Sequence, residues 1–281
     1  MSRRTLVSGH RTCSFRKQLG IGFTIFVALL HSTRQAGFAA AKLPTVAWSP
    51  RHDPLPELEE LEQVAGPNPN LAIGVLPKFL TDSEIKTLNA VAGHAQSWEV
   101  KDRHEGLVFT HYVRRIESAL REVDLDLYQK LLLTAWSVDQ QIWKNLGPLD
   151  YTLPQIEYIE YDVEKLGCEG KIAKHNDNGS MVSLVALLSD PSEFQGGANF
   201  FKGAPQKRRV VLQTGDAVFF YGHQCEHWIS PVTSGRRAIL QIELQSPKLL
   251  QSQEDPEERP PGKKGKAKGS KGAGRTRGRR R

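Results

Sequence analysis

Residues 214–244, TGDAVFFYGHQCEHWISPVTSGRRAILQIEL, consist of short apolar runs that end at Gly, Pro or Ser. Such runs are typical of β-strands joined by tight turns. The pattern extends back to Pro148 and predicts strands at residues 156–161, 182–188, 198–201, 209–213, 217–221 and 237–244. Because no helical pattern separates them, we expect an antiparallel sandwich or jelly roll, and not a parallel sheet with crossover helices.

Helices are expected only before these strands. In residues 72–95 a short strand precedes a helix, whose start is marked by the capping-box spacing of Thr81 and Glu84. A second helical region is predicted within residues 115–146, where apolar side chains recur at helical spacing. The expected fold class is therefore mainly β with flanking helices (α+β).

Charge is distributed unevenly along the 281 residues. The segments 1–42 and 263–281 hold seven and ten of the 38 Lys and Arg residues and no acid, so 21 basic residues remain against all 31 acids. The net charge of +7 therefore belongs to the two tails, and the body is acidic. No run reaches the roughly 20 apolar residues that a bilayer span requires, so we expect no stable membrane span.

We divide the chain into four parts. Residues 1–42 resemble a signal or targeting leader, because basic residues precede an apolar run at 19–30 and three alanines at 39–41. The secretory pathway or endoplasmic reticulum lumen is the expected location; a plastid or mitochondrial transit peptide and an untargeted leader are the alternatives. A Pro-rich linker at 43–70 leads to the folded domain at 71–246, and a basic tail at 247–281 is expected to be disordered.

The chain has three cysteines, and this is too few for a disulfide scaffold. Cys13 lies in the leader, whereas Cys168 and Cys225 each shortly precede a histidine of interest. Those two residues would form one disulfide in an oxidising compartment, or remain as buried free thiols.

A metal site is indicated by His175 and Asp177, whose side chains leave the same face if the segment is extended. A second cluster supplies His223 and His227 from the turn between two strands. Two histidines and one carboxylate on a β-scaffold make a facial triad, which leaves coordination positions open and suits non-haem Fe(II). His227 is the expected third ligand and His223 its alternative.

A guanidinium about ten residues after the second histidine suits a carboxylate of a keto-acid. Arg236 and Arg237 both stand there. Since adjacent residues of a strand face opposite sides, only one of them is expected to enter the pocket.

Four segments together resemble the 2-oxoglutarate and Fe(II)-dependent dioxygenases of the prolyl 4-hydroxylase-like branch. They are residues 161–177 with the HxD pair, GGANFF at 196–201, GDAVFF at 215–220 and HWISPVTSGRRAIL at 227–240. The resemblance extends back through VLPKFLTDSEIKTL at 75–88 and covers roughly residues 73–245. It implies a double-stranded β-helix, or jelly-roll, core.

The resemblance also implies the site residues. His175, Asp177 and His227 match the iron ligands, and Arg237 matches the residue that binds 2-oxoglutarate. The sequence departs from the family at Asn199, where many relatives have Thr, and at Ala186 and Leu187, where some relatives place a Tyr against 2-oxoglutarate. These departures leave the second contact to the co-substrate open.

The implied activity is hydroxylation of a C–H bond with release of succinate and CO₂, and L-ascorbate serves the family as a reductant for the iron. A prolyl or other peptidyl side chain is the expected substrate. One alternative is hydroxylation or demethylation of nucleic acid bound through the basic tail, although the acidic body disfavours it. The other is a non-catalytic jelly-roll binding module.

Overall fold

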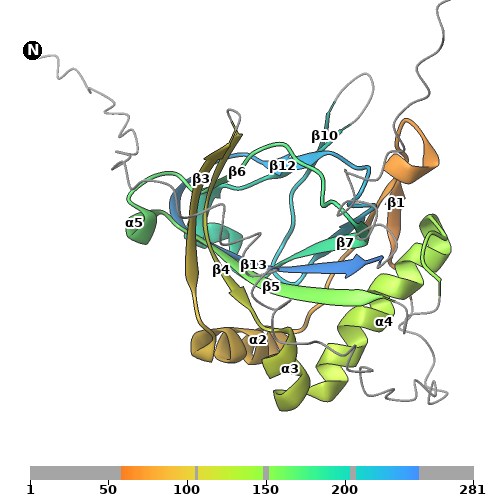
Figure 1. Cartoon of the computed structure of the whole chain (residues 1–281), viewed down its shortest axis with the longest axis horizontal. Helices are drawn as coiled ribbons and strands as arrows, with labels where there is room; N and C mark the ends of the chain where they lie inside the picture. The colour runs from red at the N-terminus through yellow and green to blue at the C-terminus, as the bar shows by residue number, and fades with distance from the viewer. Residues whose placement is uncertain (1–57, 105–106, 148–151, 203–206, 247–281) are drawn as a thin grey trace, which may run out of the picture.

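Two antiparallel sheets face each other in the computed structural model, which describes residues 58–104, 107–147, 152–202 and 207–246 (Figure 1). The central strands of the larger sheet follow the order β11-β7-β13-β5. Its strands are β1 (Glu62–Val64), β2 (Ile73–Leu76), β3 (Trp98–His104), β4 (Leu107–Arg115), β5 (Leu153–Asp162), β6 (Lys171–Ile172), β7 (Ser180–Leu187), β8 (Phe194–Gly196), β11 (Ala217–Phe220) and β13 (Val232–Gln245). The smaller sheet contains β9 (Asn199–Phe201), β10 (Arg208–Val210) and β12 (His227–Ile229).

The chain passes repeatedly from one sheet to the other. It leaves β5, touches β12 of the smaller sheet through a bridge at His175, and returns to the larger sheet as β7. It then supplies β9 and β10 to the smaller sheet, β11 to the larger, β12 to the smaller and β13 to the larger. This winding is that of a jelly roll, which confirms the predicted fold class and core.

Alternating side chains of the central strands enter two separate cores. On the inner face Ile159, Val185 and Ile239 pack between the sheets, together with Phe220. The alternate positions, including Tyr158, Leu184 and Leu240, pack against the helices. Because side chains alternate across a strand, buried residues on both faces explain why these strands are almost continuously apolar.

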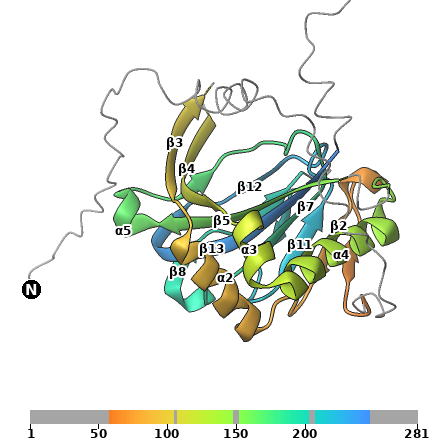
Figure 2. The same ribbon diagram turned by 60° about the horizontal axis from the view of Figure 1, so that its bottom comes forward.

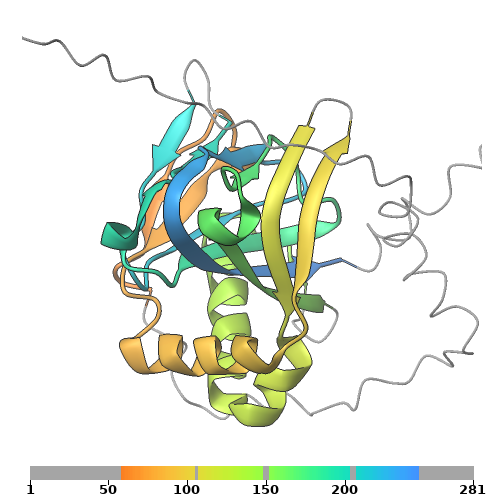
Figure 3. The same ribbon diagram turned by 90° about the vertical axis from the view of Figure 1, so that its left-hand side faces the viewer.

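Helices cover the outer face of the larger sheet (Figures 2 and 3). They are α2 (Asp82–His94), α3 (Glu117–Val123) and α4 (Leu125–Ile142); α5 (Val163–Leu166), η1 (Pro69–Leu71) and η3 (Pro191–Glu193) are single turns. The capping box of α2 is present, since Glu84 N donates to Thr81 Oγ1 (3.3 Å) and Thr81 N donates to Glu84 Oε2 (2.8 Å). The second helical region is divided in two, because Asp124 caps α4 by accepting a hydrogen bond from Leu127 N (2.9 Å).

Two features depart from the sequence-based expectation. Strands β3 and β4 form an antiparallel hairpin that was not predicted. Strand β1 lies inside the range 43–70, which was expected to be a linker. It pairs with β2, so the folded part begins before residue 71. The leader at 1–42 and the tail at 247–281 lie outside the described residues. Among the residues that are described, no helix is both long and apolar enough to cross a bilayer.

Candidate metal centre

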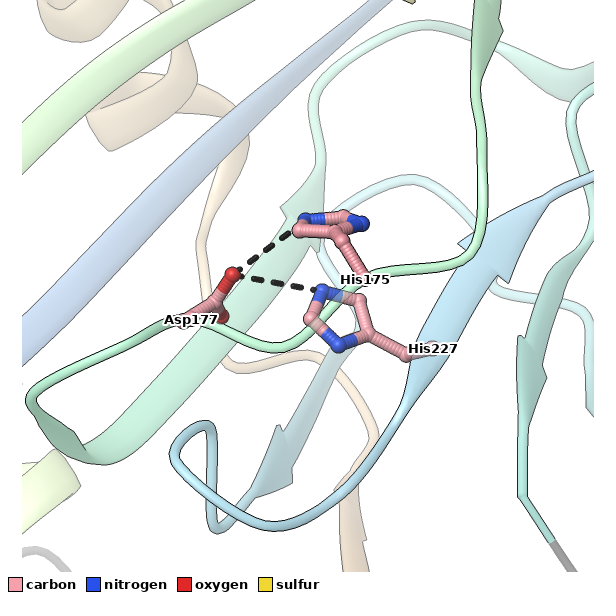
Figure 4. Close-up of side chains that lie close together, drawn as sticks. All are labelled: His175, Asp177 and His227. Carbon is pink, nitrogen blue, oxygen red and sulfur yellow. Dashed lines mark ion pairs between the residues drawn. The ribbon is translucent and has the colours of Figure 1, made fainter. Parts of the chain in front are cut away.

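The side chains of His175, Asp177 and His227 point toward one another (Figure 4). Asp177 Oδ1 lies 3.3 Å from His175 Nε2 and 3.5 Å from His227 Nε2. The potential ligand atoms of the three residues all lie within 4.8 Å of one another. Two imidazoles and one carboxylate are therefore positioned to share a single metal ion.

Backbone hydrogen bonds fix the positions of these residues. His175 N donates to His227 O (3.0 Å), and His227 N donates to His175 O (2.9 Å). Asp177 N donates to the carbonyl of Gly222 (3.0 Å). The two histidines are thus direct neighbours across a β-bridge, and Asp177 is fastened to the turn that precedes β12.

Further hydrogen bonds orient the side chains. The Nδ1 atoms of His175 and His227 lie 2.8 Å and 3.0 Å from the carbonyl oxygens of Ala173 and Cys225. Because a carbonyl accepts, each Nδ1 carries a proton, and in the neutral imidazole Nε2 then keeps a lone pair directed at the centre. Ser183 Oγ donates to Asp177 Oδ2 (2.6 Å), which leaves Oδ1 facing the two imidazoles.

The electrostatic balance favours an ionised Asp177 and a neutral His227, whereas for His175 the hydrogen bond and charge of Asp177 outweigh burial and raise the pKa. Burial opposes ionisation of Asp177, but His227, His175 and the Ser183 hydroxyl outweigh it and lower the pKa of this carboxyl. Burial also lowers the pKa of His227, and Asp177 offsets only part of this effect. An ionised carboxylate beside a neutral imidazole is the donor set that a divalent transition metal requires.

A buried cation lies on the same side of the larger sheet. Arg237 is 1% exposed, and its Nη2 donates to Asn199 Oδ1 (3.3 Å). The guanidinium lies over the ring of Tyr161, and neither its Nη1 nor the Tyr161 hydroxyl, both buried, has a hydrogen-bond partner among the described residues. No carboxylate within the described parts of the chain forms an ion pair with Arg237, so no side chain there balances its charge.

Arg236 points the opposite way, as strand alternation requires. Its Nε donates to Glu160 Oε2 (2.7 Å) on the outer face, and its side chain is 46% exposed. Of the two candidates, the structure therefore places Arg237 inside and Arg236 outside.

The structure also shows where the other residues considered from the sequence lie. His223 lies apart from the triad, and its Nδ1 accepts a hydrogen bond from Gly179 N (3.3 Å). Gly197 has φ +66°, and a Cβ there would lie 2.5 Å from Arg237 Cδ, so this glycine makes room for the arginine. Cys168 and Cys225 are buried free thiols, so they do not form the disulfide considered from the sequence.

Two residues of this region were not singled out from the sequence. Ser183 holds Asp177, and Glu243 lies directly opposite Ser183 on the neighbouring strand β13. Glu243 could have been found from the sequence. Side chains alternate along a strand, so positions 239, 241 and 243 must lie on the same inner face as Arg237.

Comparison with known proteins gave matches at the level of structure only. No protein-family model matches the chain, and no curated protein sequence matches it. A 2OG-Fe(II) oxygenase family oxidoreductase from Burkholderia pseudomallei is 14% identical, with TM-score 0.46, over 62% of this chain and 84% of that one. A prolyl-4-hydroxylase from Pseudomonas putida is 16% identical, with TM-score 0.44, over 62% and 92%.

A third similar structure is a prolyl hydroxylase from Trichoplax adhaerens in complex with a hypoxia inducible factor peptide. It is 14% identical, with TM-score 0.45, over 64% of this chain and 85% of that one. The three structures are thus described as one 2OG-Fe(II) oxygenase family member and two prolyl hydroxylases.

Proposed function

We propose that this protein is a 2-oxoglutarate- and Fe(II)-dependent dioxygenase that hydroxylates a C–H bond of its substrate. The observation that carries the proposal is the meeting of His175, Asp177 and His227 within 4.8 Å, on the same side of a sheet as the buried Arg237.

The triad fits Fe(II) in its chemistry. Two imidazoles and one carboxylate leave neighbouring coordination positions open, as an oxygenase centre requires. Each histidine has its Nδ1 fixed by a carbonyl, so that Nε2 of His175 and Nε2 of His227 would hold the metal together with Asp177 Oδ1.

The inner pocket fits 2-oxoglutarate. A buried guanidinium without a counterion is costly, and a carboxylate of the co-substrate would supply both the charge and acceptors for Arg237 Nη1. Burial raises the pKa of Tyr161 to about 12, so its hydroxyl keeps its proton and remains available to donate to the same carboxylate. Tyr161 would then make the second contact that the departures at Ala186, Leu187 and Asn199 left open.

Bound iron would supply the oxidising chemistry that couples conversion of 2-oxoglutarate to succinate and CO₂ with hydroxylation of the substrate. The protein would position the reactants. Arg237 would orient the co-substrate, and Ser183 and the carbonyls of Ala173 and Cys225 would hold the metal ligands in place. The apolar side chains of Ile159, Val185 and Ile239 keep water from the inner pocket.

We expect the substrate to be a prolyl or other peptidyl side chain, because the family that the sequence resembles acts mostly on protein.

We also propose L-ascorbate as a reductant for the iron. The leader at 1–42 would direct the protein into the secretory pathway, with a plastid or mitochondrion as the alternative location. Nucleic acid bound through the tail at 247–281 remains the second candidate.

The test is formation of succinate from 2-oxoglutarate by the purified full chain with Fe(II) and ascorbate, followed by mass spectrometry of candidate peptides for a gain of one oxygen. His175→Ala or Asp177→Ala should abolish turnover and metal binding while circular dichroism stays unchanged. Arg237→Ala should raise the KM for 2-oxoglutarate, with Arg236→Ala as the matched control. A non-catalytic binding module would form no succinate under any of these conditions.

A further inference from the structure

The inner face of β13 continues past the proposed pocket to an acidic residue. Arg237, Ile239, Gln241 and Glu243 occupy alternate positions of the strand and therefore share one face. Gln241 lines the same cavity as His175 and His227. Glu243 is thus the next inward-facing residue beyond that cavity on this strand.

Glu243 also lies close to the metal-binding residues. It stands directly opposite Ser183 in the antiparallel pair of β13 and β7, where Cβ atoms are about 5 Å apart. The hydroxyl of Ser183 lies 2.6 Å from Asp177 Oδ2. One side chain therefore separates Glu243 from the triad, and the charge of Asp177 contributes, after burial, to raising the pKa of Glu243.

Among the residues that the structure describes, no cationic side chain forms an ion pair with this carboxylate. Glu243 is 8% exposed, and within the described part of the chain its oxygens accept hydrogen bonds from the amides of Gln241 (3.0 Å) and Gln245 (3.1 Å) alone. No Lys, Arg or His within the described ranges forms an ion pair with it. Glu157, on the same face, has Arg115 at 3.2 Å. A buried carboxylate without a cation is costly, and such groups are ordinarily paired.

We infer that Glu243 binds a positively charged group of the substrate, the ammonium of a peptidyl lysine or the guanidinium of a peptidyl arginine. This inference rests on the proposed function and narrows its substrate class, because a prolyl side chain carries no charge. The bound cation would supply the missing partner of Glu243, and its alkyl chain would extend past Ser183 toward the metal centre. The amides of Gln241 and Gln245 would keep the carboxylate oriented.

The test measures binding of small probes to the metal-free full chain by saturation-transfer NMR at pH 8, where Glu243 is mostly ionised. The probes are n-butylammonium and n-butylguanidinium, with n-butanol as the uncharged probe of equal chain length. We expect the charged probes to bind at least tenfold more tightly than n-butanol. Glu243→Gln should bring the affinities within twofold of each other. Glu164→Gln, at an exposed position on α5, is the matched control and should keep the preference.

Two outcomes would overturn the inference. One is equal affinity of the wild type for charged and uncharged probes, which needs no variant and so does not depend on how Glu243→Gln folds. The other is a preference that persists in Glu243→Gln, which would assign it to a different carboxylate. Since binding is measured without iron or turnover, failure here is distinguishable from failure to form succinate.

Discussion

Replacing Ser183 with alanine removes the hydroxyl that binds Asp177 Oδ2 at 2.6 Å. Ser183 is fully buried, so water cannot replace that hydroxyl without rearrangement of the neighbouring strands. A hydrogen bond to a charged group contributes about 1.5–3 kcal/mol. Because tenfold in affinity corresponds to about 1.4 kcal/mol, and partners of metal ligands typically contribute 10–100-fold, we expect the dissociation constant for the metal to rise by about 10–100-fold.

The assay is titration of the metal-free full chain with Co(II), followed by the visible absorption of the bound ion, with Fe(II) under anaerobic conditions as confirmation. The matched control is Ser137→Ala on α4. That serine is also buried, and its hydroxyl has no hydrogen-bond partner in the described ranges, so its loss should leave metal affinity unchanged. Wild-type affinity in Ser183→Ala, or equal weakening in both variants, would refute the assignment of Ser183 as a positioning residue for Asp177.

Three further changes should alter co-substrate binding or the stability of the fold. Gly197→Ala should raise the KM for 2-oxoglutarate in a succinate assay, because the added Cβ would lie 2.5 Å from Arg237 Cδ and φ is +66°; an unchanged KM would contradict this packing. Asp139→Asn should lower the free energy of unfolding by about 1–3 kcal/mol in chemical denaturation without changing metal affinity, since its two oxygens accept backbone N–H groups beyond the end of α4. Burial raises the pKa of Glu243 to about 7 from the 4.5 expected in the unfolded chain, so ionisation disfavours the folded state. The metal-free protein should therefore lose stability, relative to Glu243→Gln, as pH rises from about 4.5 through 7, and parallel stability curves of the two proteins would count against the shift.

The strands and the site could be predicted to different extents. The jelly-roll strands are apolar over most of their length because both faces are buried, and this made them visible in the sequence. The hairpin of β3 and β4 was missed because its first strand, WEVKDRH, is largely charged, as is common for a strand at the edge of a sheet. The division between α3 and α4 was missed because apolar spacing alone does not show that Asp124 caps a new helix.

Within the site, spacing along the chain was enough to predict the positions of some residues but not of others. His175 and Asp177 are two positions apart, and strand alternation separates Arg237 from Arg236, so the sequence carries both relations directly. The contact between Ser183 and Asp177 and the pairing of Glu243 with Ser183 depend on strand register, which spacing along the chain does not specify.

The reciprocal backbone pair between His175 and His227 has a consequence for the order of assembly. These residues are 52 positions apart, and bringing the ends of such a loop together in a flexible chain costs about 3–4 kcal/mol of entropy. In the native protein the β-bridge already holds the two imidazoles next to each other. Binding of a metal ion therefore does not have to bring them together. The ion should therefore bind the native chain much more tightly than the denatured chain. The melting temperature of the protein should then rise with the logarithm of the free metal concentration.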